Sequence, residues 1–191
     1  EAAARLMQDS FAADEVLYRP LPPNELRARF FAPEAVAFAA HESGRLIGWI
    51  HATARTRLLP GETPENTPLY LTLIFVEKSA RRQGVGTALL ARIREEGVRL
   101  GKKTLLVSGD NPVHLTWVIP HTNGCDHNNA PGVDEHCMGY DFLLKHGFHD
   151  DFHEIAMFLN LADYRWDPSL DDKLAALEAE GIRVGIWDPS C

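Results

Sequence analysis

The chain has 191 residues, of which 45% are hydrophobic and 24% charged, with a formal net charge of −8. This balance is close to that of an average globular chain and excludes a disordered, collagen-like or coiled-coil protein. The acidic charge argues against nucleic acid as the partner, and no apolar stretch reaches the roughly 18 residues of a membrane span. Three cysteines are too few for a disulfide framework. We therefore expect a cytoplasmic protein of one domain, with no nucleic-acid or membrane partner.

The first half of the chain predicts two helices followed by three strands. Residues 1–11 place apolar side chains four residues apart on one helical face, and Asn24 is a suitable N-cap for the second helix. The strand-like segments are rich in apolar and β-branched residues, and Ser43-Gly44 joins the first two as a hairpin. The three predicted strands cover residues 35–42, 45–54 and 69–76.

The second half of the chain predicts alternating helices and strands. A long amphipathic helix at 84–100 precedes a strand at 104–108, and about thirty residues without periodicity follow. A short helix at 140–146 ends at Gly147, a typical C-cap residue, and a strand at 152–161 closes the sheet. This order of elements predicts an α/β (α+β) fold with helices packed on a mixed central sheet.

The clearest chemical signal lies between the third strand and the long helix, at residues 81–87, which we call the phosphate turn. Its sequence is Arg-Arg-Gln-Gly-Val-Gly-Thr. Gly84 and Gly86 lack a Cβ, so the backbone can approach a ligand, and the N–H groups of a helix's first turn attract anions. Neither a Walker Gly-Lys-Ser/Thr nor the third glycine and acidic residue of a Rossmann turn is present. The pattern predicts a pyrophosphate site of another kind.

Two segments carry a resemblance to a known family. Arg81–Gly86 fits the pattern Gln/Arg-x-x-Gly-x-Gly/Ala of the GNAT acyltransferase superfamily, and Leu143–Phe148 is similar to its Tyr-x-x-x-Gly-Phe. The chain resembles this superfamily from its first helix to about Leu161. The resemblance implies a central sheet splayed at the fourth and fifth strands, and acetyl-CoA or another acyl-CoA as co-substrate. The cofactor-binding residues that it implies are Ile74, Phe75, Val76, Arg81, Arg82, Gln83, Gly84, Val85, Gly86, Thr87, Asn111 and Lys145.

The resemblance also implies that an amine attacks the thioester directly, with the N–H of Val76 polarising the carbonyl. The family's tyrosine that protonates the leaving thiolate is replaced by Leu143, and Tyr140, on the same helical face, is the candidate acid. Packing is the alternative role of Tyr140. The candidate bases, each of which also has a purely structural interpretation, are Glu77, His51 and His114.

Seven of the nine histidines lie between residues 114 and 153, many of them in a stretch that is long for a simple connection. We interpret residues 112–138 as an inserted loop, and Trp117-Val-Ile-Pro120 as an apolar anchor that favours a lid over the acceptor site. A zinc site is the other interpretation, but its spacing matches no zinc-finger pattern, so we expect no metal. Its ligands would be His121, Cys125, His127, His136 and Cys137.

The predicted domain covers residues 1–164, with the inserted loop at 112–138, and residues 165–191 form a tail of one helix and one strand. Because the family's first strand is missing from the start of the chain, we expect the sequence to be cut from a longer one. The tail is then the linker to, or the start of, a second domain of a tandem GNAT protein. Alternatively, its strand completes the sheet, within one chain or by exchange in a homodimer, or it is a plain linker.

The leading functional hypothesis is an N-acyltransferase that moves an acetyl group from acetyl-CoA to a primary amine of a small molecule. The alternative is a non-catalytic acyl-CoA-binding or structural module of a tandem protein. Leu143 favours this alternative, whereas the phosphate turn supports cofactor binding under both hypotheses. The acidic net charge suits a cationic acceptor.

Overall fold

The chain divides into two compact units, Glu1–Glu154 and Ile155–Cys191. The computed structural model describes residues 2–14, 18–19, 21–118, 126–127, 132–155 and 159–185, except for the side chains of 11–14 and 126–127. Each unit is described by itself.

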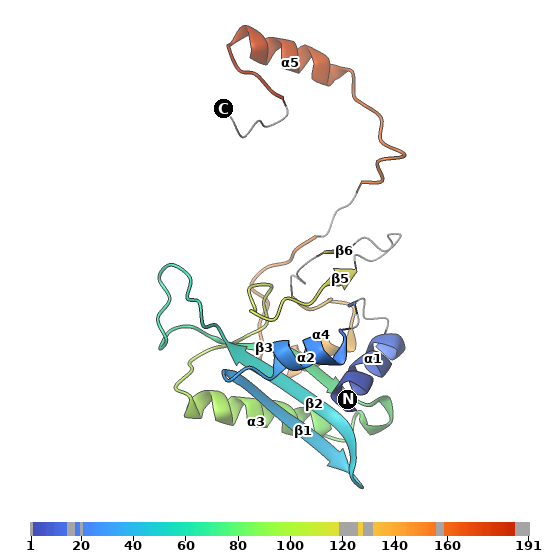
Figure 1. Cartoon of the computed structure of the whole chain (residues 1–191), viewed down its shortest axis with the longest axis vertical. Coiled ribbons are helices and arrows are strands. Elements are labelled where there is room, and N and C mark those ends of the chain that lie inside the picture. Colours follow the sequence, from blue (N-terminus) through green and yellow to red (C-terminus); the bar gives the residue numbers. More distant parts are fainter. Residues whose placement is uncertain are drawn as a thin grey trace. The chain divides into compact units, whose positions relative to one another are not determined.

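The first unit contains a four-stranded mixed sheet in the order β1-β2-β3-β4. Strands β1 (Ala35–Glu42), β2 (Arg45–Ala54) and β3 (Leu69–Val76) are antiparallel neighbours, and β4 (Leu105–Leu106) pairs parallel to β3. This sheet with helices on both faces confirms the predicted fold class (Figure 1).

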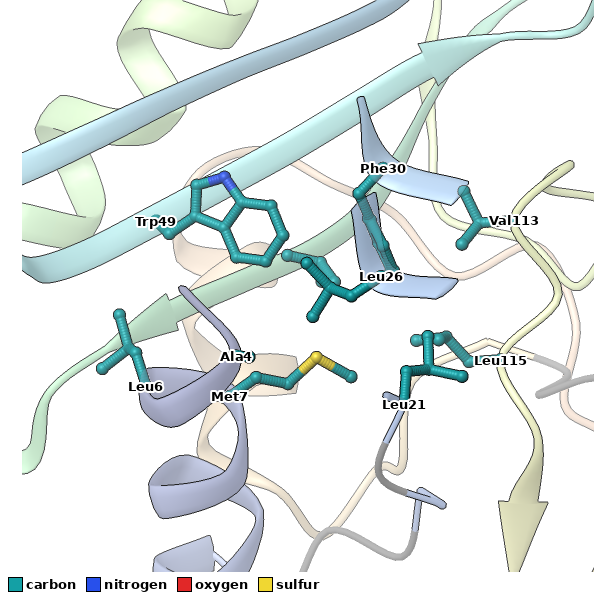
Figure 2. Close-up of a cluster of buried hydrophobic side chains, with 10 residues drawn as sticks. Ala4, Leu6, Met7, Leu21, Leu26, Phe30, Trp49, Val113 and Leu115 are labelled. Atoms are coloured by element: carbon teal, nitrogen blue, oxygen red, sulfur yellow. The ribbon is translucent and has the colours of Figure 1, made fainter. Parts of the chain in front are cut away.

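The helices form one layer on each face of the sheet. Helices α1 (Ala2–Asp14) and α2 (Pro23–Phe30) supply side chains to one core, and α3 (Val85–Arg99) and α4 (Met138–Lys145) to the other. Figure 2 shows this cluster, in which side chains of α1 and α2 lie between Trp49 of β2 on one side and Val113 and Leu115 on the other. The core under α3 contains Ile50, Ala52, Leu69, Leu71, Leu89, Leu90, Ile93 and Leu143.

A β-bulge in β3 changes which of its side chains face each of the two cores. His51 of β2 pairs with Leu73, but the next residue, Ala52, pairs with Leu71, so Thr72 has no partner in the register. The extra residue reverses which side chains face which core. Leu71 packs under α3, whereas Leu73 packs on the α1 and α2 side.

Two elements differ from the sequence-based expectation at their ends. Helix α2 begins at Pro23, with Pro22 as the N-cap in place of Asn24, because the fixed φ of proline suits the first helical turn. Strand β4 is limited to Leu105–Leu106, shorter than the predicted 104–108.

The predicted strand at 152–161 does not form in the described residues: 152–155 and 159–160 lie in no helix or strand, and 156–158 are outside the description. Phe152, Ile155 and Leu159 are exposed. Alternating apolar residues predict a strand, but a strand also needs a neighbour to pair with, and β4 is only two residues long.

The second unit contains one described helix, α5 (Ser169–Ala179), in which no residue is buried. The predicted tail strand is absent from residues 182–185, and its remainder lies outside the described residues. In the first unit, a small antiparallel pair joins β5 (Trp117–Val118) to β6 (Asp126–His127) within the predicted inserted loop. Among the described residues, no helix combines the length and apolar character needed to cross a membrane.

Candidate functional site

The phosphate turn is an exposed stretch of backbone between β3 and α3. Arg82 has a φ of 61° and Gly84 a φ of 85°, so two residues close together are left-handed. Left-handed residues in such turns direct successive N–H groups toward one concave surface that binds anions. Gly84 is also the N-cap of α3, whose first N–H groups have no acceptor within the helix. The backbone is therefore suited to a pyrophosphate.

The two glycines of the phosphate turn are needed for different reasons. No atom lies within 4 Å of the position that a Cβ of Gly84 would take, so the surface there is open, and the positive φ is the reason for glycine. A Cβ on Gly86 would lie 3.3 Å from Cε2 of Phe142 and 3.7 Å from Cγ2 of Val76. Gly86 therefore lets α4 pack closely against the start of α3.

Two side chains of the phosphate turn bind the protein itself. Nε of Arg81 donates to the carbonyl of Val76 at 2.8 Å, and Nε2 of Gln83 donates to the carbonyl of Ser79 at 2.8 Å. These bonds fix the turn to the last residue of β3 and to the segment that follows it, whereas the side chain of Arg82 is exposed. These two hydrogen bonds fix the inner side of the turn, and residues 82–84 remain exposed to solvent.

The start of α3 also contacts the end of α4. Oγ1 of Thr87 lies 3.0 Å from Nε2 of His146, the residue that caps α4. Val85 packs in the core under α3, and Lys145, the last residue of α4, is exposed. The phosphate turn, α3 and α4 therefore form one connected group, as the family resemblance implies for a cofactor site.

Strands β3 and β4 separate soon after they meet. Leu69 pairs with Leu105 and Tyr70 with Leu106, and no later pair is formed among the described residues. Beyond Tyr70, β3 therefore runs toward the phosphate turn with one edge that pairs with no other strand among the described residues. At its end, the carbonyl of Val76 accepts the hydrogen bond from Arg81. The separation of the two strands is the splayed geometry expected of a site for an extended cofactor arm.

The direction of the backbone groups at the end of β3 follows from one hydrogen bond. The N–H of Glu77 donates to the carbonyl of Ile47 at 2.8 Å, toward β2. Because backbone groups alternate in direction along a strand, the N–H groups of Val76 and Ile74 face the opposite, unpaired edge. Of the predicted cofactor residues in β3, these two present a backbone donor there, and Phe75 does not.

His51 lies inside the sheet and cannot contact a substrate in this structure. Its residue surface is 0% exposed, and Nδ1 lies 2.5 Å from Oγ1 of Thr72, the bulged residue of β3. Burial lowers the pKa of His51 to about 4, because charging an imidazole away from water is unfavourable. Nε2 has no hydrogen-bond partner among the described residues.

Glu77 is held in an ion pair directly after β3. Its Oε1 accepts hydrogen bonds from Nη1 of Arg45 at 2.6 Å and from Oγ of Ser79 at 3.1 Å. The hydrogen bond from Arg45 lowers the pKa of Glu77, so the carboxylate is ionised, as a general base requires, but is also less basic.

A cavity of about 730 Å³ adjoins Glu77, between α1, the start of β2 and the segment after β3. Its charged lining residues are Arg5, Asp9, Arg45, Glu77, Lys78 and Arg81. A second cavity of about 500 Å³ is lined by β1 and by the first turns of α3, including Gly84. Arg81 therefore borders the first cavity, and Gln83, Gly84 and Val85 border the second.

Tyr140 donates a hydrogen bond from its hydroxyl to Oδ2 of Asp150 at 2.7 Å. This bond raises the pKa of Tyr140, because ionising the phenol would place two negative charges together. Leu143, at the position of the family's tyrosine, is buried in the core under α3. The phenol is protonated and so retains the proton that a general acid would need.

Asn111 and His114 shape the segment that leads away from β4. The side chain of Asn111 donates to the carbonyl of Ser108 at 2.9 Å and accepts from the N–H of Val113 at 3.0 Å. His114 is exposed, has a φ of 50°, and its carbonyl accepts a bond from Nη1 of Arg29 at 2.9 Å. In this structure Asn111 stabilises a turn, and the ring of His114 is open to solvent.

Within the histidine-rich insertion, the described residues include His136 and Cys137. No group of three side chains suited to a metal ion occurs in the described part of the chain. His136 and His153 lie near Glu135, at 3.7 and 3.5 Å. The other residues of the zinc hypothesis, His121 and Cys125 and the side chain of His127, fall outside the description.

Four residues that contact the candidate site were not identified from the sequence: Arg45, Phe142, His146 and Asp150. Each acts on a candidate residue through a contact that no local pattern shows. The one available signal was the position of His146 directly before Gly147, inside the segment that resembles the family. An imidazole at a helix end close to an anion site is a feature that sequence inspection can find.

Known proteins share sequence features and the fold with this chain. Residues 3–114 match the sequence profile described as the acetyltransferase (GNAT) family. A ribosomal-protein-alanine N-acetyltransferase from Brucella melitensis biovar Abortus 2308 has a similar structure, with a TM-score of 0.51 and 16% identity over 83% of this chain and 91% of that one.

Two aminoglycoside acetyltransferases are similar to the same degree. AAC(6')-Iy, in complex with the bisubstrate analogue CoA-S-monomethyl-acetylneamine, has a TM-score of 0.51 and 17% identity over 84% of this chain and 93% of that one. An enzyme from an uncultured soil metagenomic sample, in complex with trehalose, has a TM-score of 0.53 and 16% identity, covering 82% and 86% of the two chains.

No curated protein matches the sequence significantly. At identities below one fifth, the structural similarities establish the fold alone. The profile match covers more than half of the chain and includes the sheet, the phosphate turn and α3. The chain therefore belongs to the acetyltransferase (GNAT) family.

Proposed function

We propose that this chain is an N-acyltransferase that transfers an acetyl group from acetyl-CoA to a primary amine of a small molecule. The observation that carries the proposal is the combination of an unpaired β3 edge with the phosphate turn at its end. An unpaired edge can hydrogen-bond an extended amide-containing chain, and the turn can bind a pyrophosphate. Coenzyme A contains both groups in that order.

The backbone supplies most of the proposed cofactor contacts. The N–H groups of residues 82–87 would hold the phosphates, and those of Ile74 and Val76 would pair with the pantetheine arm. The exposed Lys145 at the end of α4 would add positive charge near the phosphates. Asn111, which holds its own turn, would support the cofactor from the β4 side.

Acetyl-CoA, when bound, supplies an activated thioester to the amine. The N–H of Val76 would stabilise the negative charge that develops on the thioester oxygen. The ionised carboxylate of Glu77 would accept the proton of the amine through one water molecule. Tyr140 would donate its hydroxyl proton to the leaving thiolate, although a thiol of nearly neutral pKa leaves readily without an acid.

A cationic amine is the acceptor that the charges favour. Asp150, Glu135 and Asp141 lie close enough to Tyr140 to raise its pKa by their negative charge. Carboxylates around the acceptor would attract an ammonium group and so raise the encounter rate. The similar structures include an aminoglycoside acetyltransferase and a ribosomal-protein-alanine N-acetyltransferase. The test therefore includes an acceptor of each kind.

The alternative, a non-catalytic acyl-CoA-binding module, is favoured by one observation. The side chain at position 143 is a leucine that is 7% exposed and packed in the core, so it supplies no proton. Both functions predict CoA binding, and only the enzyme predicts turnover.

The test is a thiol-release assay with acetyl-CoA and a panel of amines, run beside calorimetric titration with CoA. The panel contains an aminoglycoside, an aliphatic polyamine and a peptide with a free N-terminal alanine. Amine-dependent thiol release, with the acetylated amine identified by mass spectrometry, is the expected result. CoA binding without release for any amine would favour the binding module, and absence of CoA binding would reject both functions.

A further inference from the structure

His146 connects the end of α4 to the phosphate turn through both of its ring nitrogens. Nδ1 lies 2.8 Å from the carbonyl oxygen of Phe142, and Nε2 lies 3.0 Å from Oγ1 of Thr87, 59 residues away in the sequence. Thr87 is in the first turn of α3. The imidazole therefore touches the one hydroxyl side chain in the phosphate turn.

The chemistry of these contacts fixes where the protons are. A carbonyl oxygen can only accept a hydrogen bond, so Nδ1 of His146 carries the proton of the neutral ring. Nε2 then has a lone pair and accepts the hydroxyl proton of Thr87. In this state the hydroxyl of Thr87 donates toward α4, so this proton is not available to a ligand of the turn.

The ring of His146 is held firmly in this position. Its centroid lies 4.3 Å from that of Phe142, whose ring in turn fits against Gly86. The guanidinium of Arg94 donates to the carbonyl of His146 and lies 5.8 Å from the ring centroid of Phe148. An imidazole fixed by two hydrogen bonds and a ring contact loses little entropy when a ligand binds beside it.

We propose that His146 is a positioning residue whose protonation is coupled to binding of the CoA pyrophosphate. On binding, His146 takes one proton from solvent at Nε2, and the hydrogen bond reverses so that Nε2–H donates to Oγ1 of Thr87. The hydroxyl proton of Thr87 is then free to donate to a phosphate oxygen. The N–H bond formed at Nε2 is the one covalent change, with solvent as the proton source, and the added positive charge lies one hydroxyl group away from the anion.

The neighbouring charges favour this coupling. Arg94 of α3 donates to the carbonyl of His146, and Lys145 of α4 is its neighbour in the chain. Both are cations, so a bound anion is the partner that would stabilise a third positive charge. By linkage, the affinity for CoA should then rise as the pH falls. This inference rests on the proposed function, because it requires a CoA pyrophosphate at the phosphate turn.

The experiment is isothermal titration calorimetry of the whole chain with CoA, in buffers of different ionisation enthalpy at about pH 7.5, where a free imidazole is mostly neutral. We expect uptake of about half a proton or more with CoA. Pantetheine, which lacks the pyrophosphate, should produce none. The His146→Gln variant should lose the uptake and bind CoA about 5- to 10-fold more weakly, a loss comparable to one charge-assisted hydrogen bond.

Two variants make the test specific. His149→Gln changes an exposed histidine three positions away and should keep the proton uptake. Thr87→Val removes the hydroxyl at similar volume, and combining it with His146→Gln should cost little more affinity than either change alone. Additive losses, or CoA binding by the wild type without proton uptake, would overturn the inference while leaving the proposed function intact. Absence of CoA binding by the wild type would instead remove the proposed function.

Discussion

The phosphate turn and the two proton-transfer candidates, Glu77 and Tyr140, are built in different ways. The turn presents backbone N–H groups whose direction is set by local dihedral angles. Glu77 and Tyr140 present side chains whose protonation is set by Arg45 and Asp150, which lie elsewhere in the chain. The proposed anion binding therefore depends on local conformation, and the proposed proton transfer depends on pairs formed by folding. Changes in the turn should alter CoA affinity, whereas changes in the pairs should alter the pH profile.

The largest effect is expected from Gly86→Val. A Cβ at this position would already lie 3.3 Å from Phe142, so a branched side chain must push α4 away from α3. Overpacking of this kind destabilises a protein by about 1–3 kcal/mol. Because the first turn of α3 also moves, we expect a loss of CoA affinity of about 100-fold, or about 2.7 kcal/mol, by calorimetric titration.

Gly97→Ala is the matched control for this variant, because it also adds a Cβ within α3. That Cβ would make an ordinary contact of 3.4 Å with Leu69, away from the phosphate turn. Its CoA affinity should equal that of the wild type. Unchanged affinity in Gly86→Val would show that close packing of α4 is not needed for binding.

Glu77→Gln tests the proposed role of Glu77 in proton transfer. If Glu77 is the base, removing its charge should lower kcat by about 100-fold, at the lower end of general-base effects, with little change in CoA affinity. Arg45→Met keeps the carboxylate but removes the hydrogen bond that lowers its pKa. The pKa of Glu77 then rises, so the acidic limb of the kcat/KM profile should move to higher pH.

The ion pair between Arg45 and Glu77 also predicts how the stability of the protein changes with pH. Because the folded state lowers the pKa of Glu77, the pair stabilises the protein above the unfolded carboxyl pKa of about 4.3 and loses this contribution as the pH falls below it. The side chain of Arg45 is 59% exposed, so the contribution is small.

A normal kcat in Glu77→Gln would contradict the role of Glu77 as the base and would leave it as an ion-pair partner only.

The phosphate turn, whose conformation is local, is the part of this comparison that the sequence predicts. Ser43-Gly44 between two apolar segments predicts the β1–β2 hairpin, and Gly84 and Gly86 before an amphipathic segment predict the start of α3. In each case a few adjacent residues determine the backbone conformation. The family resemblance depends on the same local segments.

Features that need a partner far along the chain were not predictable. The bulge at Thr72 exists only in the register between β2 and β3, and Arg45 lies 32 residues from Glu77. The failed prediction of a strand at 152–161 has the same cause, because periodicity indicates an extended segment but not the strand that pairs with it. Single-sequence patterns therefore predict the local backbone of a candidate cofactor site better than the long-range pairs that set side-chain protonation.

Gly84→Ala should give a smaller effect than Gly86→Val has on CoA affinity or Glu77→Gln has on kcat. Gly84 and Gly101 both have positive φ, at 85° and 71°, and a Cβ on either would meet no atom within 4 Å. Both alanine variants should therefore lose a similar stability of about 1–2 kcal/mol from backbone strain. Only Gly84→Ala should also weaken CoA binding, by about 3- to 10-fold, because its φ directs the N–H groups of the phosphate turn. Equal CoA affinity in the two variants would contradict the role of that dihedral angle.

The smallest effect is expected from Tyr140→Phe, because a thiol with a pKa near that of cysteine leaves readily without an acid. We expect kcat to fall by about 2- to 5-fold. Asp150→Asn keeps the phenol but removes the carboxylate that raises its pKa, so the basic limb of the kcat profile should move to lower pH in this variant. Tyr140→Phe should instead remove that limb, because no phenol remains to titrate. If neither variant changes the basic limb, Tyr140 serves only to hold Asp150, and the leaving thiolate takes its proton from water.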